Sequence, residues 1–357
     1  MEKKETNMKT AIISFTLSGC QLGQTVAEGL RKLGYEAEEF TKSIYTMEQS
    51  LYAVKESLSV WTKQAFSNYD AILFIGACGI AVRSIAPYVK DKKTDPAVVV
   101  MDEQGKHVIS LLSGHLGGAN ELTMQIAQLT GASPVITTAT DINGKFAVDV
   151  FAKKHKCAIS SMKIAKEISA ALVAGEPVGF YSKFPVQGKI PQELLPYEEA
   201  GEQPKYGISV SESMEKKSYE HTLFLIPSVV TVGIGCRKGT PADKIERAVD
   251  TVLEELHMPI EALEQVSSID VKKEEEGLLQ FCREHKLPFL TYSAAQLAAV
   301  EGTFTESEFV KNQVGVGSVC ERSAVLASKN GKIIRGKYAC DGVTVACAVR
   351  EWSVKFE

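Results

Sequence analysis

A glycine-rich turn around one histidine is the part of this sequence whose residue types could do chemistry. Residues 106–120 read KHVISLLSGHLGGAN, which is a buried-strand run, a turn and the start of an amphipathic helix. Gly114, Gly117 and Gly118 carry no side chain where the backbone turns, so a ligand can come close, and N–H groups at a helix start attract an anion. His115 in the turn is of the side-chain type that titrates near neutral pH. The turn predicts an anion site with a proton carrier, although on this segment alone a tight turn whose histidine bonds to the backbone is the favoured interpretation.

Two more glycine turns precede predicted helices in the last third of the chain. GIGCRKGT at 233–240 places Arg237 and Lys238 beside a helix start, which suits a carboxylate because arginine binds one in bidentate fashion. A solvated basic turn explains those two residues equally well. VGVGSVCER at 314–322 presents Ser318 and Glu321, and there a carboxylate that only complements the helix dipole is the favoured interpretation of Glu321.

Weaker signals complete the candidate set. Arg83 follows Gly76 and Gly79 by one helical turn, where it could hold an anion or lie on the surface. Asp141 borders a strand and could act as a base, but capping or turn formation is commoner for aspartate there. The candidates for ligand binding are Gly76, Gly79, Arg83, Ser113, Gly114, Gly117, Gly118, Asn120, Arg237, Lys238 and Ser318, and those for proton transfer are His115, Glu321 and Asp141.

Composition and missing motifs exclude several function classes. The sequence has no Walker A loop, GxGxxG fingerprint, GxSxG elbow or HExxH helix, so no nucleotide, serine-hydrolase or zinc-hydrolase chemistry is implied. The net charge of −4 gives no general attraction to nucleic acid or an acidic membrane. None of the eight cysteines forms a CxxC pair, so we expect reduced thiols, no metal site and a cytoplasmic protein without a signal or membrane segment.

The succession of predicted strands and helices that must position these residues indicates three domains. The chain of 357 residues is longer than a single hydrophobic core usually supports, and we expect domains at 1–145, 146–228 and 229–357. The two end domains alternate strands and helices, which predicts α/β domains with mostly parallel sheets, and a small α+β domain lies between them. Ligands bind at the carboxyl ends of such strands, and the GACG (76–79), SGHLGGAN (113–120) and TTATD (137–141) segments all follow predicted strands.

Local signals predict element boundaries in the last domain. Thr240 is a plausible N-cap, with Pro241 at the first helical position. Residues 314–328 read as strand, glycine turn and helix, and residues 332–351 as a β-hairpin that closes the chain.

Six long motifs follow one another along the chain, at residues 74–122, 134–141, 233–240, 267–279, 309–328 and 342–348. In this succession they resemble the cobalt-precorrin-5A hydrolase family of the anaerobic cobalamin pathway. The resemblance covers both end domains with a variable middle domain between them, and the last domain is also similar to small single-domain proteins of the aerobic pathway. Cys78 is a minor departure, since it stands where a small residue is expected.

This resemblance implies an enzyme that opens the δ-lactone on ring A of cobalt-precorrin-5A. The C20 two-carbon unit then leaves as acetaldehyde, giving cobalt-precorrin-5B. Cobalt arrives with the substrate, so no separate cofactor is implied. The partners implied are the corrinoid itself and neighbouring pathway enzymes, with no nucleic acid or membrane, and we expect both end domains to hold the substrate. A non-catalytic corrinoid carrier of the same pathway is the alternative, because glycine turns can bind without catalysing.

Overall fold

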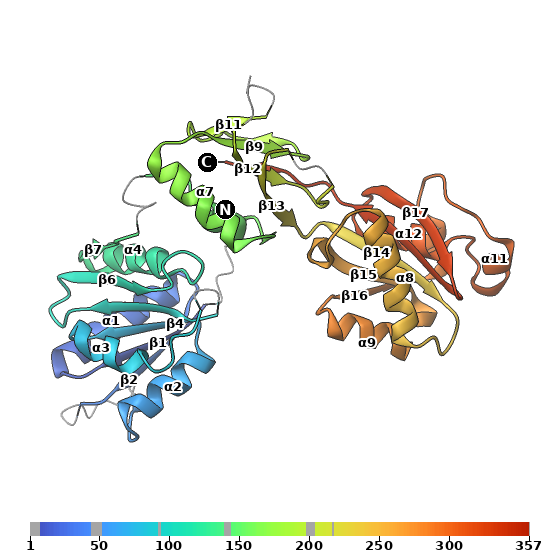
Figure 1. The fold of residues 1–357 in the computed structure, drawn as a ribbon. Helices are drawn as coiled ribbons and strands as arrows, with labels where there is room; N and C mark the ends of the chain where they lie inside the picture. Colours follow the sequence, from blue (N-terminus) through green and yellow to red (C-terminus); the bar gives the residue numbers. More distant parts are fainter. Residues whose placement is uncertain are drawn as a thin grey trace. The chain divides into compact units, whose positions relative to one another are not determined.

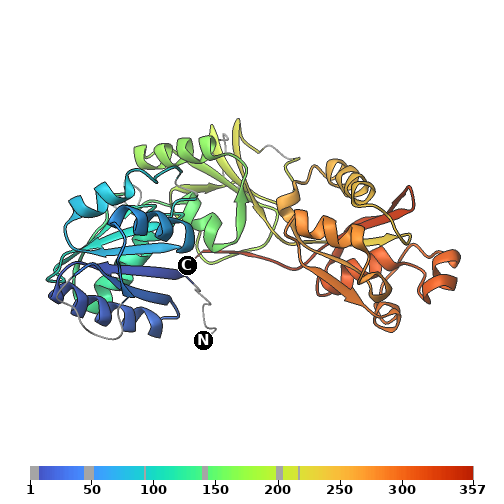
Figure 2. The same cartoon turned by 90° about the horizontal axis from the view of Figure 1, so that it is seen from below.

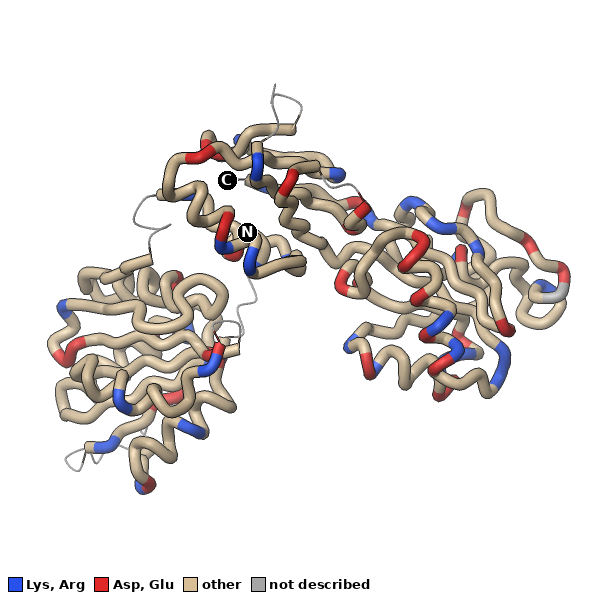
Figure 3. The backbone as a smooth tube through the Cα atoms, viewed as in Figure 1, with Lys and Arg blue, Asp and Glu red and all other residues tan. Residues whose placement is uncertain are grey.

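The computed structural model describes residues 8–43, 52–91, 94–138, 144–197, 204–215 and 218–356. The chain divides into two compact units, residues 1–150 and 151–357, and each is described by itself (Figure 1). Charges of both signs are interspersed along each unit (Figure 3), so neither presents a uniformly basic or acidic trace. No helix in the described part of the chain is both long and apolar enough to cross a bilayer.

The first unit is built on a seven-stranded sheet of order β3-β2-β1-β4-β5-β6-β7. Helices α1 and α4 cover one face with apolar side chains, and α2 and α3 cover the other. Both central strands, β4 and β5, are therefore buried along their whole length, as their continuous apolar runs predict. The strands are β1 Lys9–Ser14, β2 Glu36–Thr41, β3 Tyr52–Ala53, β4 Ala71–Ile75, β5 Ala97–Met101, β6 His107–Leu112 and β7 Ser133–Val135; the helices are α1 Leu17–Lys32, α2 Leu58–Asn68, α3 Cys78–Ile85 and α4 Ala119–Thr130, and α6 Val148–Lys154 follows.

Strand direction changes once in this sheet, between β5 and β6. Strands β1 to β5 run parallel to one another, β5 pairs with β6 antiparallel, and β6 pairs with β7 parallel. The carboxyl end of β6 therefore lies at the edge where β4 and β5 begin. Two glycine turns therefore lie at opposite ends of the strands of this sheet, although each follows the carboxyl end of its own strand. They are residues 76–79 and residues 113–120. The turn at residues 102–106 is short enough to connect β5 and β6 as a hairpin, and that connection reverses the direction.

The middle segment of the second unit carries a five-stranded sheet of order β11-β9-β12-β13-β8. Four of these strands are parallel, and only β8 at the edge is antiparallel. Helix α7 packs against the sheet, as Figure 2 also shows from below. The elements are β8 Cys157–Ile159, α7 Met162–Ala174, β9 Val178–Ser182, β10 Val186–Gln187, β11 Leu194–Pro196, β12 Tyr206–Val210 and β13 His221–Pro227.

The C-terminal segment has a five-stranded sheet of order β16-β15-β14-β18-β17. Strands β14, β15 and β16 are parallel, and the β17–β18 hairpin adds two antiparallel strands beside β14. The elements are β14 Val230–Cys236, α8 Ala242–Glu255, β15 Leu263–Ile269, α9 Glu276–Glu284, β16 Phe289–Tyr292, α10 Ala294–Ala298, α11 Glu308–Val314, α12 Val319–Ala327, β17 Lys332–Cys340, β18 Val343–Val349 and β19 Val354–Lys355, with 3-10 turns at Ile260–Ala262 and Asp270–Lys272. Strand β19 returns to pair with β10 of the middle segment.

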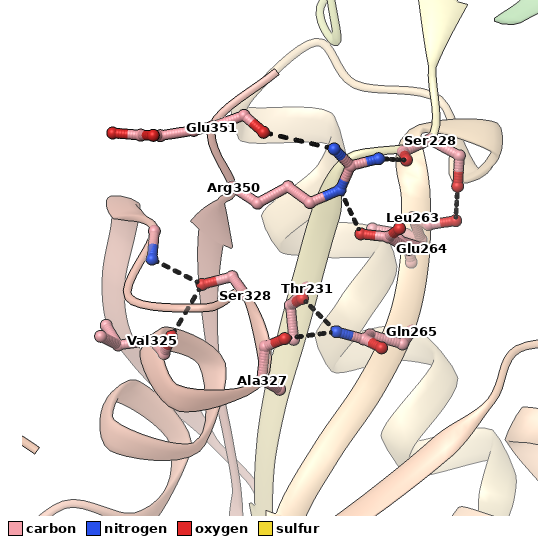
Figure 4. Close-up of polar contacts among 11 residues, drawn as sticks. Ser228, Thr231, Leu263, Glu264, Gln265, Val325, Ala327, Ser328, Arg350 and Glu351 are labelled. Atoms are coloured by element: carbon pink, nitrogen blue, oxygen red, sulfur yellow. Dashed lines mark hydrogen bonds and ion pairs between the residues drawn. The ribbon is translucent and has the colours of Figure 1, made fainter. Parts of the chain in front are cut away.

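Polar contacts join neighbouring elements at the end of the C-terminal sheet where the parallel strands β14 and β15 begin, which we call its amino edge (Figure 4). Gln265 Nε2 donates to Thr231 Oγ1 at 3.1 Å and to the Ala327 carbonyl at 2.7 Å, which ties β15 to β14 and to the end of α12. Arg350 Nε donates to Glu264 Oε2 at 2.7 Å. Because these groups bond to one another, this edge is structural, and the opposite, carboxyl edge is the one that remains for a ligand.

Three local predictions were wrong in detail. Helix α8 begins at Ala242, so Pro241 is the N-cap residue, and the Thr240 hydroxyl donates to the Arg237 carbonyl at 2.8 Å instead of capping the helix. Residues 314–317 form no strand. Helix α11 ends at Val314 because Gly315 adopts the left-handed conformation, with φ of 80°. Strand β7 is Ser133–Val135, so residues 136–138 of the predicted 134–141 strand lie outside it, and residues 139–141 lie outside the described part of the chain.

Candidate functional site

His115 faces a carboxylate that the sequence analysis did not single out. Its Nδ1 lies 3.1 Å from Oδ1 and 3.3 Å from Oδ2 of Asp149, in the first turn of α6. Both side chains are 13% exposed, so the pair is mostly buried yet still reaches solvent. An ionised carboxylate can only accept a hydrogen bond, so this contact requires a proton on Nδ1, and the neutral ring with that proton has Nε2 as its basic nitrogen. A histidine oriented in this way by an aspartate is the arrangement of a general base.

The glycine turn is held in shape by its own backbone. The N–H of Ala119 donates to the Ser113 carbonyl at 3.2 Å, and that of Asn120 donates to the Gly114 carbonyl at 2.9 Å. The N–H of Gly118 donates to the His115 carbonyl at 3.0 Å. These three N–H groups at the start of α4 are therefore already bonded within the turn and are not free for the anion expected there.

Close packing explains the residue types of the turn. A Cβ at position 117 would lie 2.3 Å from Ser113 Cβ, so only glycine fits there. Asn120 accepts a bond from Ser110 Oγ at 2.6 Å and donates Nδ2 to Thr138 Oγ1 at 3.1 Å, which makes it a support for the turn. The Ser113 hydroxyl is buried and makes no hydrogen bond within the described residues, which is unusual for a buried polar group.

The candidates Gly76, Gly79 and Arg83 do not join this group. Gly76 and Gly79 lie at the start of α3 and Arg83 lies in its last turn. This glycine turn is at the opposite end of the strands from His115, because β6 runs antiparallel to β5. Arg83 is exposed and its Nη1 donates to the Gly79 carbonyl at 3.3 Å, within its own helix. The structure thus separates two glycine turns that the sequence suggested were parts of one site.

A second concentration of candidates lines a pocket of about 960 Å³ at the carboxyl edge of the C-terminal sheet. Arg237 and Lys238 follow β14, Ser318 precedes α12, and Lys272 and Lys337 line the same pocket. The sequence analysis missed both of these lysines. Lys337 lies in a β-strand, and the sequence alternation of that strand does not show which face points inward. Lys272 forms an ion pair with Glu275 at 2.9 Å. The structure therefore assembles Arg237, Lys238 and Ser318 into one concave site.

Glu321 has a structural task. It is 3% exposed and accepts bonds from Ser318 Oγ at 2.8 Å, from Thr305 N at 2.6 Å and Oγ1 at 3.0 Å, and from Lys337 N at 3.0 Å. Burial raises the pKa of the Glu321 carboxyl, but these hydrogen bonds outweigh burial and hold the pKa below its usual value. A lowered pKa and four structural hydrogen bonds do not favour the proton-transfer role for which the sequence analysis named Glu321 as a candidate.

The remaining candidate, Asp141, lies outside the described residues. Within the residues that are described, no three histidine, cysteine or carboxylate side chains gather as a metal-binding set. Asp149 carries no special signal in the sequence, because an acidic residue in the first turn of a helix is ordinary. The pair it forms with His115 depends on tertiary structure.

Three family models of cobalamin synthesis proteins match successive parts of this chain. The Cobalamin synthesis G N-terminal model matches residues 60–141, the Cobalamin biosynthesis central region model matches 146–227, and the Cobalamin synthesis G C-terminus model matches 230–348. The cobalt-precorrin-5A hydrolase of Salmonella typhimurium is 39% identical over 295 residues, covering 80% of this chain and 84% of that protein. The cobalt-precorrin-5A hydrolase of Priestia megaterium is 31% identical over 354 residues, covering 95% and 94%. A solved cobalamin biosynthesis protein G homologue from Sulfolobus solfataricus is 25% identical and covers 97% of this chain and 99% of its own, with a TM-score of 0.43.

Proposed function

Because this chain belongs to the cobalt-precorrin-5A hydrolase family, we propose that it opens the ring A δ-lactone of cobalt-precorrin-5A and releases acetaldehyde. The products are cobalt-precorrin-5B and the C20 two-carbon unit as the aldehyde. The observation that carries the catalytic part of the proposal is the His115–Asp149 pair, at 3.1 Å.

The pair can serve both steps of this reaction. In the first step, Nε2 of His115 takes a proton from water, the resulting hydroxide adds to the lactone carbonyl, and the ring C–O bond breaks. The imidazolium, stabilised by Asp149, returns the proton to the released alkoxide, leaving a carboxylic acid and an alcohol. In the second step, Nε2 takes the alcohol proton, the C–C bond breaks, and acetaldehyde leaves. The electron pair of that bond passes into the macrocycle and its cobalt, which belong to the substrate, and the imidazolium then gives its proton to the macrocycle or to water, which regenerates the neutral ring.

The turn around His115 supports this role. The rigid backbone bonding of the turn holds the imidazole in place, which limits the reorganisation needed during the reaction. No dissociable cofactor enters either step, so the proposal includes none.

The decisive experiment is acetaldehyde release from cobalt-precorrin-5A by three variants. His115→Asn and Asp149→Asn should each lower the saturated rate by about 10²–10⁴-fold, the usual contribution of a general acid–base group. His107→Asn is the matched control, because His107 is exposed at the other end of β6 and its backbone N–H makes the bond to Asp102. That variant should retain normal turnover.

Two results would overturn the proposal. If wild-type protein binds the corrinoid and releases no acetaldehyde, the carrier alternative is correct. If His115→Asn turns over normally at saturation with weaker substrate binding, His115 positions substrate and another group is the base.

A further inference from the structure

The pocket of the C-terminal domain combines three cationic side chains that lack an anionic partner. Among the described residues, Arg237, Lys238 and Lys337 form no ion pair, whereas the neighbouring Lys272 is paired with Glu275 at 2.9 Å. Glu275 also accepts the Gly239 N–H at 2.5 Å and interacts with Lys238 only electrostatically, beyond ion-pair distance. Two other carboxylates of the pocket, Glu274 and Asp341, are exposed and hydrated, which weakens their effect on the cations. The pocket is therefore equipped to bind added carboxylates.

Its remaining wall is apolar. Val271 is 67% exposed, the highest value among the exposed large hydrophobic side chains of the described chain, and it lines this pocket. Val310 and Val314 of α11 lie on the same wall. Burial raises the pKa of Cys236 to about 11, so its thiol is neutral and adds no negative charge. Apolar side chains and cations that line one pocket suit a flat ring with carboxylates at its rim.

The cationic side of the pocket is held rigid by Glu321. Its carboxylate accepts from the Lys337 backbone and from Ser318 Oγ, and so fixes β17 and the start of α12 relative to each other. Because these walls are set before a ligand enters, little ordering is needed on binding. The volume of about 960 Å³ lies at the upper end of the range for small-molecule sites.

We propose that this pocket is a binding site for the carboxylate rim of a corrinoid, with Arg237, Lys238 and Lys337 contacting the carboxylates and Val271 and α11 contacting the ring. The identity of the macrocycle rests on the function proposed above. The binding itself does not depend on His115, so the two proposals fail separately.

The test measures binding of cobyrinic acid to the full-length chain by titration calorimetry, with its methyl ester as the uncharged ligand. Arg237→Ala and Lys337→Ala should each weaken binding by about tenfold, the effect of losing one charge-assisted contact of about 1.4 kcal/mol. Lys332→Ala is the matched control, since Lys332 is exposed on the same strand and does not line the pocket. It should bind as the wild-type chain does. Binding of the acid should also weaken with added salt.

The outcomes separate the two proposals. His115→Asn should bind cobyrinic acid with unchanged affinity. Equal affinity for acid and ester, or equal losses in Lys332→Ala and Lys337→Ala, overturns the assignment of this pocket. Wild-type binding that depends on Lys337, without any acetaldehyde release from cobalt-precorrin-5A, supports the pocket and overturns the hydrolase proposal.

Discussion

Replacing Glu321 by glutamine is a sharp test of the view that this residue organises the C-terminal pocket. The carboxylate accepts four hydrogen bonds: from the backbone N–H groups of Thr305 and Lys337, and from the hydroxyls of Thr305 and Ser318. Glutamine has one accepting oxygen, and its NH₂ group must face the two donors on the other side. The hydroxyl there can rotate and accept, but the backbone N–H cannot.

The expected cost follows from that geometry. Two bonds to a charged acceptor are lost, each worth about 1.5–3 kcal/mol, and part of that is regained through the rotated hydroxyl and the amide. We expect Glu321→Gln to lower the free energy of unfolding by about 2–4 kcal/mol at pH 7, measured by urea unfolding followed by circular dichroism. Glu308→Gln, at an exposed position in the first turn of α11, is the control and should change stability by no more than about 0.5 kcal/mol.

The same substitution gives a pH dependence with a definite sign. The folded-state pKa of Glu321 is lowered, because its hydrogen bonds outweigh the effect of burial. A lowered pKa contributes stability that is fully present above the unfolded value of about 4.3 and is lost as the pH falls through the folded value. The difference between wild type and Glu321→Gln should therefore be largest at neutral pH and shrink below about pH 4. A difference below about 0.5 kcal/mol at neutral pH, or one that does not change with acid, would refute the reasoning.

Three further predictions follow from the structure and the proposed chemistry. Dialysis against a chelator should leave acetaldehyde release from cobalt-loaded substrate intact, and a loss of turnover that zinc or magnesium restores would contradict this. Gly117→Ala should reduce turnover while overall circular dichroism is kept, because the added Cβ would lie 2.3 Å from Ser113 Cβ and displace the turn around His115. The exposed Cys340 should react with a thiol reagent in the folded protein, whereas Cys347, whose pKa burial raises to about 12, should react only after unfolding; equal reaction rates in native buffer would count against this packing.

Much of the architecture could be predicted from the sequence because it depends on local pattern. The apolar runs at 71–75 and 97–101 become the fully buried central strands β4 and β5, and the hairpin predicted over 332–351 forms as β17 and β18. Continuous apolar runs and turn signals act over a few residues, so they are legible without the rest of the fold. At 314–317 the pattern was ambiguous, and the left-handed Gly315 ended a helix where a strand had been predicted.

For the candidate sites, the sequence determined the residue types and their local positions, and the tertiary structure determined which residues meet. The sequence by itself determined that glycine turns follow buried strands, and that His115, Arg237, Lys238 and Ser318 stand beside helix starts. Tertiary structure alone decided which of them meet: the reversal at β6 separates the GACG turn from His115, and α6 brings Asp149 to the imidazole. It also decided that Glu321 organises a pocket wall, because its partners at 305 and 337 are 16 residues away on either side. Contacts over such separations depend on strand direction and packing, and no short sequence window contains that information.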